Sequence, residues 1–109
     1  MYNLLSLKGA VKFTSIVKFV KFFKGLRSIA NKYDIPLIYD EIQTGFCTSG
    51  KIWYFQNTAY APDIIIFGKK SQVSGAMSTK KISERINDPS KYCITWDGDI
   101  IDMIRSTYI

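Results

Sequence analysis

Residues 34–46 read DIPLIYDEIQTGF and residues 62–73 read PDIIIFGKKSQV, and these two segments decide the fold. Each contains a short apolar run: IPLIY ends directly before Asp40, and IIIF is followed, after one glycine, by Lys69. Short runs rich in β-branched and aromatic residues are typical of buried strands in an α/β sheet. Ligands of such sheets bind in the crevice beyond the carboxyl ends of the strands. We therefore predict that the carboxylate of Asp40 and the amine of Lys69 face one crevice.

The segments on either side supply the other elements of an α/β domain. Apolar residues recur at three- and four-residue steps across residues 16–33, which predicts an amphipathic helix. After the second apolar run, we predict a short third strand around residues 73–77 and a brief helix over residues 80–86. A last helix is predicted over residues 99–108, with Asp99 as its N-cap. The aromatic segment KIWYFQNTAYA, between the first two strands, is expected to cover the sheet edge.

The composition restricts the chemistry. With 109 residues the chain has room for one small domain, and no run approaches the roughly 20 apolar residues of a membrane-spanning helix. The absence of histidine excludes a Ser-His-Asp triad, a Cys-His dyad and any His-ligated zinc site. Cys47 and Cys93 match no metal spacing, so we expect free thiols in a reducing, cytoplasmic environment, with a single disulfide as the open alternative. Any chemistry then falls to lysine and carboxylates, without a metal.

The net charge of +6 is distributed unevenly along the chain. Residues 1–33 hold seven Lys or Arg and no acidic residue, whereas the remainder holds eight basic and nine acidic residues. Three interpretations are open: a transit peptide, a patch that binds a membrane surface or nucleic acid, and a solvated helix face. Lysine recurs where arginine and serine are typical of a transit peptide, which argues against the first. A solvated face, with lysine stems lying on apolar neighbours, is the commonest origin of such a charge run.

A lysine at the end of a buried strand can act as a nucleophile. Desolvation frees its amine to form Schiff bases with carbonyl groups, including the aldehyde of pyridoxal phosphate. That cofactor also needs an anion beside its pyridine nitrogen, and the side chain of Asp40 has the required chemistry. The alternative is that Asp40 and Lys69 are solvated caps of the two strands, which is the commoner role of such residues.

The sequences LIYDEIQTGF and APDIIIFGKK together resemble the class III, fold-type I, pyridoxal-phosphate-dependent aminotransferases. In that family an apolar strand ends in Asp-Glu-[Val/Ile]-Gln-Thr-Gly, and Pro-Asp-Ile leads to Gly-Lys. The segments FGKKSQVSGAMS, FFKGLRSIANKYDIPLIYDE and TWDGDIIDMIR are similar to the L-lysine 6-aminotransferases. The resemblance covers residues 19–109 and implies a fragment of the large, cofactor-binding domain, with a mostly parallel sheet flanked by helices. Residues 1–18 form a basic segment that the family does not explain.

The resemblance also implies a role for each matching residue. Asp40 would pair with the pyridinium nitrogen, Ile42 would pack on one face of the ring, and Gln43 would hydrogen-bond near the phenolic oxygen. Lys69, the lysine directly after the glycine, would form the Schiff base and move the proton during the reaction. Thr95 would reach the cofactor phosphate of the partner subunit, because these enzymes are homodimers with shared active sites.

The implied reaction is transfer of the ε-amino group of L-lysine to 2-oxoglutarate, a step of lysine catabolism. Lys70 would be a bystander in this reaction. The chain departs from the family at residues 96–99, where Trp-Asp-Gly-Asp replaces Trp-Gly-Gly-Asn. The carboxylates of Asp97 and Asp99 would repel a nearby phosphate unless they point away. The chain matches only a central block of the family, and we expect the isolated chain to be inactive. Two alternatives remain. The first is a non-enzymatic remnant, or an interaction module whose basic helix binds a membrane surface or nucleic acid. The second is a small complete enzyme that uses Lys69 for simpler Schiff-base chemistry.

Overall fold

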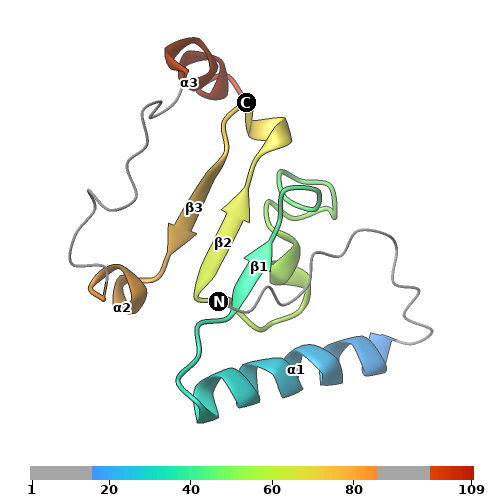
Figure 1. Cartoon of the computed structure of the whole chain (residues 1–109). Coiled ribbons are helices and arrows are strands. Elements are labelled where there is room, and N and C mark those ends of the chain that lie inside the picture. Colours follow the sequence, from blue (N-terminus) through green and yellow to red (C-terminus); the bar gives the residue numbers. More distant parts are fainter. Residues whose placement is uncertain (1–15, 86–98) are drawn as a thin grey trace.

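The computed structural model describes residues 16–85 and 99–109, with side chains described from Val20 onward. A small sheet lies at the centre, with helices at its two ends (Figure 1). In chain order the elements are α1 (Ile16–Lys32), β1 (Ile38–Asp40), the 3-10 turn η1 (Tyr54–Asn57), β2 (Ile64–Phe67), the 3-10 turn η2 (Lys69–Ser71), β3 (Gly75–Ser78), α2 (Lys80–Ser83) and α3 (Ile100–Ser106).

The sheet has the strand order β1-β2-β3. Strands β1 and β2 are parallel, with Ile38 opposite Ile64 and Asp40 opposite Ile66. Strand β3 runs antiparallel to β2, with Ser78 opposite Ile64. The three predicted strands are present and the α/β class is confirmed. The described part of the sheet is mixed rather than mostly parallel, because only a short turn separates β2 from β3 and parallel neighbours need a longer crossover.

Helix α1 crosses below the amino ends of β1 and β2 (Figure 1). Phe23 and Ala30, seven residues apart on one side of the helix, are buried together with Leu37 and Tyr39. The rings of Phe23 and Tyr39 meet edge to face, with centroids 5.5 Å apart. The chain turns out of the helix where the backbone N–H of Ile35 donates to the carbonyl of Ala30 at 2.9 Å. The helix predicted from the periodicity of residues 16–33 is therefore confirmed.

The opposite side of α1 is solvated. Lys21, Lys24 and Lys32 are exposed, as expected for a helix face whose lysine heads lie in water. Among the helices of residues 16–85 and 99–109, none is long and apolar enough to cross a membrane.

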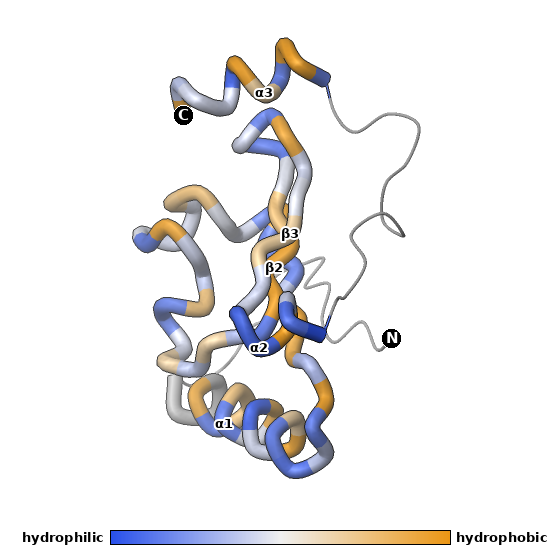
Figure 2. The backbone as a smooth tube through the Cα atoms, turned by 90° about the vertical axis from the view of Figure 1, so that its left-hand side faces the viewer, coloured by the Kyte–Doolittle hydropathy of each residue, from blue (hydrophilic) through white to orange (hydrophobic). Residues whose placement is uncertain are grey.

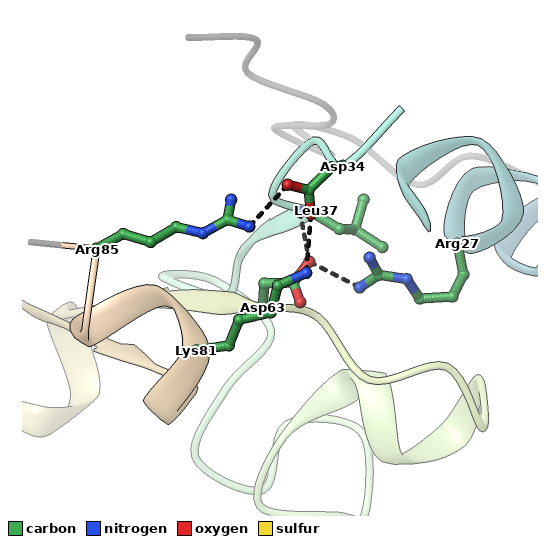
Figure 3. Close-up of polar contacts among 6 residues, drawn as sticks. All are labelled: Arg27, Asp34, Leu37, Asp63, Lys81 and Arg85. Carbon is green, nitrogen blue, oxygen red and sulfur yellow. Dashed lines mark hydrogen bonds and ion pairs between the residues drawn. The ribbon is translucent and has the colours of Figure 1, made fainter. Parts of the chain in front are cut away.

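Asp63 fixes the amino end of β2 to α1 and β1 (Figure 3). Its Oδ2 accepts hydrogen bonds from Arg27 Nη1 and from the backbone N–H of Leu37, both at 2.8 Å. The backbone N–H of Asp63 in turn donates to the carbonyl of Leu37 at 2.8 Å. Since both charged side chains are mostly buried, hydrogen bonds of this kind contribute about 1.5–3 kcal/mol each. The Asp of the Pro-Asp-Ile sequence therefore has a structural role at the start of the strand.

Asp34, in the turn after α1, is bound by the segment around α2 (Figure 3). Its carboxylate accepts from Lys81 Nζ at 2.8 Å and from Arg85 Nη2 at 2.7 Å. These hydrogen bonds, first that of Lys81 and then that of Arg85, lower the pKa of Asp34 below its usual value. Ile82 is buried beside them and anchors α2, so the brief helix predicted over residues 80–86 is present, but it ends at Ser83.

Helix α3 lies at the end of the sheet opposite α1 (Figures 1 and 2). The Oδ1 atom of Asp99 accepts from the backbone N–H of Ile101 at 2.7 Å, which confirms the predicted N-cap. The apolar side chains of α3 are largely exposed, and Ile100 is 73% exposed. Within the described residues, the apolar face predicted for this helix is therefore not covered.

Candidate functional site

Asp40 and Lys69 lie at the same edge of the sheet. Asp40 is the last residue of β1 and pairs in register with Ile66 of the parallel strand β2. Strand β2 ends at Phe67, and Lys69 begins the turn η2 two residues later. Parallel strands point their carboxyl ends to one edge of a sheet. Asp40 and Lys69 therefore both lie at the carboxyl-end edge of β1 and β2, as the sequence predicts.

The backbone of Lys69 is strained. Its φ angle is +58°, in the left-handed region that costs a residue with a side chain about 1–2 kcal/mol. The turn is held by the backbone N–H of Gln72, which donates to the carbonyl of Lys69 at 3.0 Å. The side chain of Lys69 is exposed, so the desolvation expected from its place after a buried strand is not present in the described structure. Its ammonium has no hydrogen-bond or ion-pair partner among residues 16–85 and 99–109. Strain of this kind is frequent at functional sites, where the surrounding structure enforces it.

The loop after β1 orients Asp40. Its Oδ1 atom accepts from the backbone N–H of Ile42 at 3.1 Å, and both residues are partly buried. Gln43, the next predicted site residue, is exposed on the same loop. Thr95, the predicted phosphate ligand, lies outside the described residues. The structure thus brings four of the five predicted residues to the carboxyl ends of β1 and β2, and their roles stay predictions.

Glu41 is a key residue of this site that the sequence analysis missed. It is 2% exposed. Its Oε2 accepts from the backbone N–H of Tyr54 at 2.6 Å and from Thr44 Oγ1 at 3.2 Å, and its Oε1 accepts from the backbone N–H of Phe55 at 2.9 Å. The carboxylate therefore joins the loop after β1 to η1. Strand alternation could have indicated that Glu41 is buried, because adjacent residues of a strand point to opposite faces. If Asp40 points to the solvent-accessible face, Glu41 points to the buried one.

Aromatic rings pack at the same strand end. The ring of Trp53 lies 5.2 Å from that of Phe46 and 6.0 Å from that of Phe67, measured between centroids. Tyr54 and Phe55 are partly buried against the hydrophobic core. This packing supports the interpretation of the aromatic segment as a cover for the sheet edge.

The charged groups at this edge fit the requirements of pyridoxal phosphate. That cofactor needs an amine for its aldehyde and an anion for its pyridine nitrogen, and Lys69 and Asp40 supply one of each. Within the described ranges, no group of three or more His, Cys, Asp or Glu is arranged to hold a metal ion. Cys47, on the loop after β1, is exposed and forms no disulfide within the described residues, whereas Cys93 lies outside them.

Comparison with known proteins decides the family. The sequence profile of "Aminotransferase class-III" matches residues 15–108. The chain belongs to this family. Among its class-III relatives, the L-lysine-epsilon aminotransferase of Mycobacterium tuberculosis is 39% identical over 93 residues, covering 82% of this chain and 21% of that protein. The L-lysine-epsilon aminotransferase of Streptomyces clavuligerus is 32% identical over 91 residues, covering 80% of this chain and 20% of that protein.

Solved structures of class-III aminotransferases agree in fold. The lysine aminotransferase from M. tuberculosis superposes with a TM-score of 0.73 at 38% identity, covering 80% of this chain and 21% of that one. The predicted family, the likeness to L-lysine 6-aminotransferases and the partial fold-type I architecture are confirmed. Membership of the class implies dependence on pyridoxal 5'-phosphate. The chain spans about a fifth of the length of the curated relatives that it matches.

Proposed function

We propose that this chain carries two essential groups of a pyridoxal-phosphate-dependent aminotransferase: Lys69 as the Schiff-base lysine and Asp40 as the anion beside the pyridine nitrogen. The observation that carries the proposal is the parallel register of β1 and β2, which aligns Asp40 with Ile66 and leaves Lys69 just beyond the same strand end. The strained backbone of Lys69 and its unpartnered ammonium among the described residues support the same assignment.

Asp40 acts by holding a charge in place. The backbone N–H of Ile42 fixes one carboxylate oxygen of Asp40, so the negative charge has a defined position at the strand end. An anion there keeps the pyridine nitrogen protonated, and the bound cofactor then supplies an electron sink. In the same proposal three further residues would help to hold the cofactor: Ile42 would pack on the ring, Gln43 would hydrogen-bond near the phenolic oxygen, and Thr95, which lies outside the described residues, would bind the phosphate held by the partner subunit.

Lys69 acts as nucleophile and proton carrier. Its amine, exposed at the mouth of β2, is the group that would hold the cofactor through its aldehyde. When Nζ is not bound to the cofactor, it would take up a proton from the substrate and return it. This role suits a chain without histidine.

The amino donor that we propose is L-lysine, with transfer of its ε-amino group to 2-oxoglutarate in a homodimer. The support is the 39% identity to the L-lysine-epsilon aminotransferase of M. tuberculosis. The chain covers 21% of that relative, and the apolar side chains of α3 are exposed. We therefore expect the 109 residues alone to be inactive in transamination, while the amine of Lys69 still reacts with the aldehyde of pyridoxal phosphate.

Reductive labelling tests the proposal. The chain is incubated with pyridoxal phosphate, reduced with borohydride and digested, and the modified lysines are mapped. We expect Lys69 to be labelled several-fold more than Lys80, which is 89% exposed and serves as a reference for surface lysines. The Asp40→Asn variant is expected to lower labelling at Lys69, whereas Asp102→Asn, a change in the exposed helix α3, leaves it unchanged. Labelling of Lys69 no stronger than that of Lys80 rules out the proposed site.

A further inference from the structure

We infer that Lys70 is a positioning residue for the proposed cofactor site, and this inference rests on the proposed function. The Nζ atom of Lys70 donates to the carbonyl oxygen of Gly45 at 3.2 Å, across 25 residues of sequence. Lys70 belongs to η2, the turn that also carries Lys69, whereas Gly45 belongs to the loop that follows Asp40. The contact therefore ties the strand end that bears the amine to the strand end that bears the carboxylate.

The acceptor of this bond is held firmly. The backbone N–H of Gly45 donates to the carbonyl of Glu41 at 2.8 Å, and Thr48 Oγ1 donates to the same Gly45 oxygen at 3.0 Å. A Cβ atom at Gly45 would lie 2.9 Å from the carbonyl oxygen of Glu41 and 2.9 Å from the ring of Trp53. The loop is thus packed so closely around Gly45 that its carbonyl has one position.

The donor starts from an equally fixed backbone. Ser71, the residue after Lys70, is buried and its Oγ donates to the carbonyl of Val73 at 2.6 Å. The backbone N–H of Gln72 closes the turn on the carbonyl of Lys69 at 3.0 Å. With both ends anchored, the bond of Lys70 sets the position of the turn relative to the loop after β1.

This arrangement distinguishes two adjacent lysines that the sequence alone leaves alike. The amine of Lys70 is engaged by a backbone carbonyl, whereas the amine of Lys69 has no partner within residues 16–85 and 99–109. Lys70 therefore acts through Lys69, by holding the turn from which the free amine extends. The bystander role that the resemblance gives Lys70 is replaced by a positioning role.

Variants of the whole chain test the inference. Lys70→Met removes the donor at nearly constant length, Lys70→Arg keeps a donor, and Lys81→Met removes a different lysine whose Nζ makes a 2.8 Å bond. The readout is the rate of reductive labelling by pyridoxal phosphate at Lys69, divided by the rate at Lys80 in the same sample. We expect this ratio to fall about two- to fivefold in Lys70→Met, a modest loss because Lys70 is itself exposed and its bond to Gly45 is 3.2 Å long. The ratio is expected to stay near the wild-type value in Lys70→Arg and Lys81→Met.

A second readout needs no cofactor. The carbonyl ¹³C shift of Gly45 and the backbone shifts of Lys69 are expected to move in Lys70→Met, to recover in Lys70→Arg, and to be unaffected in Lys81→Met. An unchanged Gly45 signal in Lys70→Met overturns the inference, and so does equal loss of labelling in the Met and Arg variants. A wild-type chain that is not labelled at Lys69 refutes the proposed function and the positioning role with it. A labelled wild type with an equal ratio in Lys70→Met refutes the inference alone.

Discussion

Replacing Glu41 by Gln removes the charge that organises the loop between the first two strands. The Glu41 carboxylate is 2% exposed and accepts backbone N–H bonds from Tyr54 at 2.6 Å and Phe55 at 2.9 Å, on different oxygens. A glutamine has the same shape, but one of its two terminal atoms is an NH₂ group, which cannot accept a hydrogen bond. The backbone N–H that faces this NH₂ group therefore loses Glu41 as its acceptor, in a part-buried position.

The loss follows from these contacts. Leaving one buried N–H without an acceptor costs about 1–3 kcal/mol, and the bond that remains is about half as strong once the acceptor is neutral. Relief from burying a carboxylate offsets part of the loss. We expect Glu41→Gln to lower the free energy of unfolding by about 2–4 kcal/mol.

Urea denaturation followed by circular dichroism measures this change. With a urea slope of about 1–3 kcal/mol per molar for a small protein, the midpoint of Glu41→Gln is expected to fall by about 1–2 M. Glu84→Gln is the matched control, because Glu84 is 65% exposed and its ion pair with Lys80 at 3.6 Å contributes less than about 0.5 kcal/mol. Equal midpoints for the two variants would refute the argument that the buried carboxylate holds the loop.

Four further substitutions test other parts of the structure. Gly45→Ala places a Cβ atom 2.9 Å from the ring of Trp53 and is expected to cost about 1–3 kcal/mol of stability. Gly25→Ala, in α1 with nothing within 4 Å of the added atom, is expected to gain about 0.5–1 kcal/mol; a loss at both positions in urea unfolding would contradict this pair. Burial raises the pKa of Tyr39 from 10.0 to about 12. The neutral phenol therefore contributes fully to the free energy of unfolding below pH 10, and this contribution is lost as the pH rises through about 12. Alkaline unfolding of Tyr39→Phe should accordingly lose less stability across that interval, and an unchanged pH profile counts against the assignment. Asp63→Asn weakens the link between β2 and α1 and is expected to lower the free energy of unfolding by about 1–3 kcal/mol. A shift of the urea midpoint by less than about 0.2 M, which corresponds to roughly 0.5 kcal/mol, would contradict this prediction.

The elements of the fold were largely predictable because each follows from local spacing. The apolar periodicity of residues 16–33 predicted α1, the run IIIF predicted β2 with the bounds that the structure shows, and Asp99 predicted the start of α3. The first strand is the exception, since IPLIY predicts five residues and β1 comprises Ile38–Asp40. Pro36 has no N–H to donate, and the N–H of the next residue is taken by the Asp63 side chain.

The site divides in the same way. The sequence placed Asp40 and Lys69 at the ends of two apolar runs, and the parallel pairing of those runs brought the two residues to one edge. It did not identify Glu41 as the anchor of the aromatic segment, because strand alternation indicates that Glu41 is the buried member of the Asp-Glu pair but not which backbone groups it binds. The contact of Lys70 was likewise out of reach, because its acceptor is a backbone carbonyl and leaves no mark in the sequence.

By itself the sequence determined the class of the fold, the family and the edge of the sheet at which a carboxylate and an amine are offered. These properties depend on the order and spacing of side chains along single segments, which are visible without coordinates. Only the tertiary structure decided which polar group each side chain contacts. Glu41 reaches a backbone N–H 13 residues away and Lys70 a carbonyl 25 residues away. Such pairings depend on how loops close in space, so adjacent residues at a strand end acquire different contacts: Glu41 and Lys70 bind backbone groups of other segments, whereas Asp40 and Lys69 are the residues proposed to hold the cofactor.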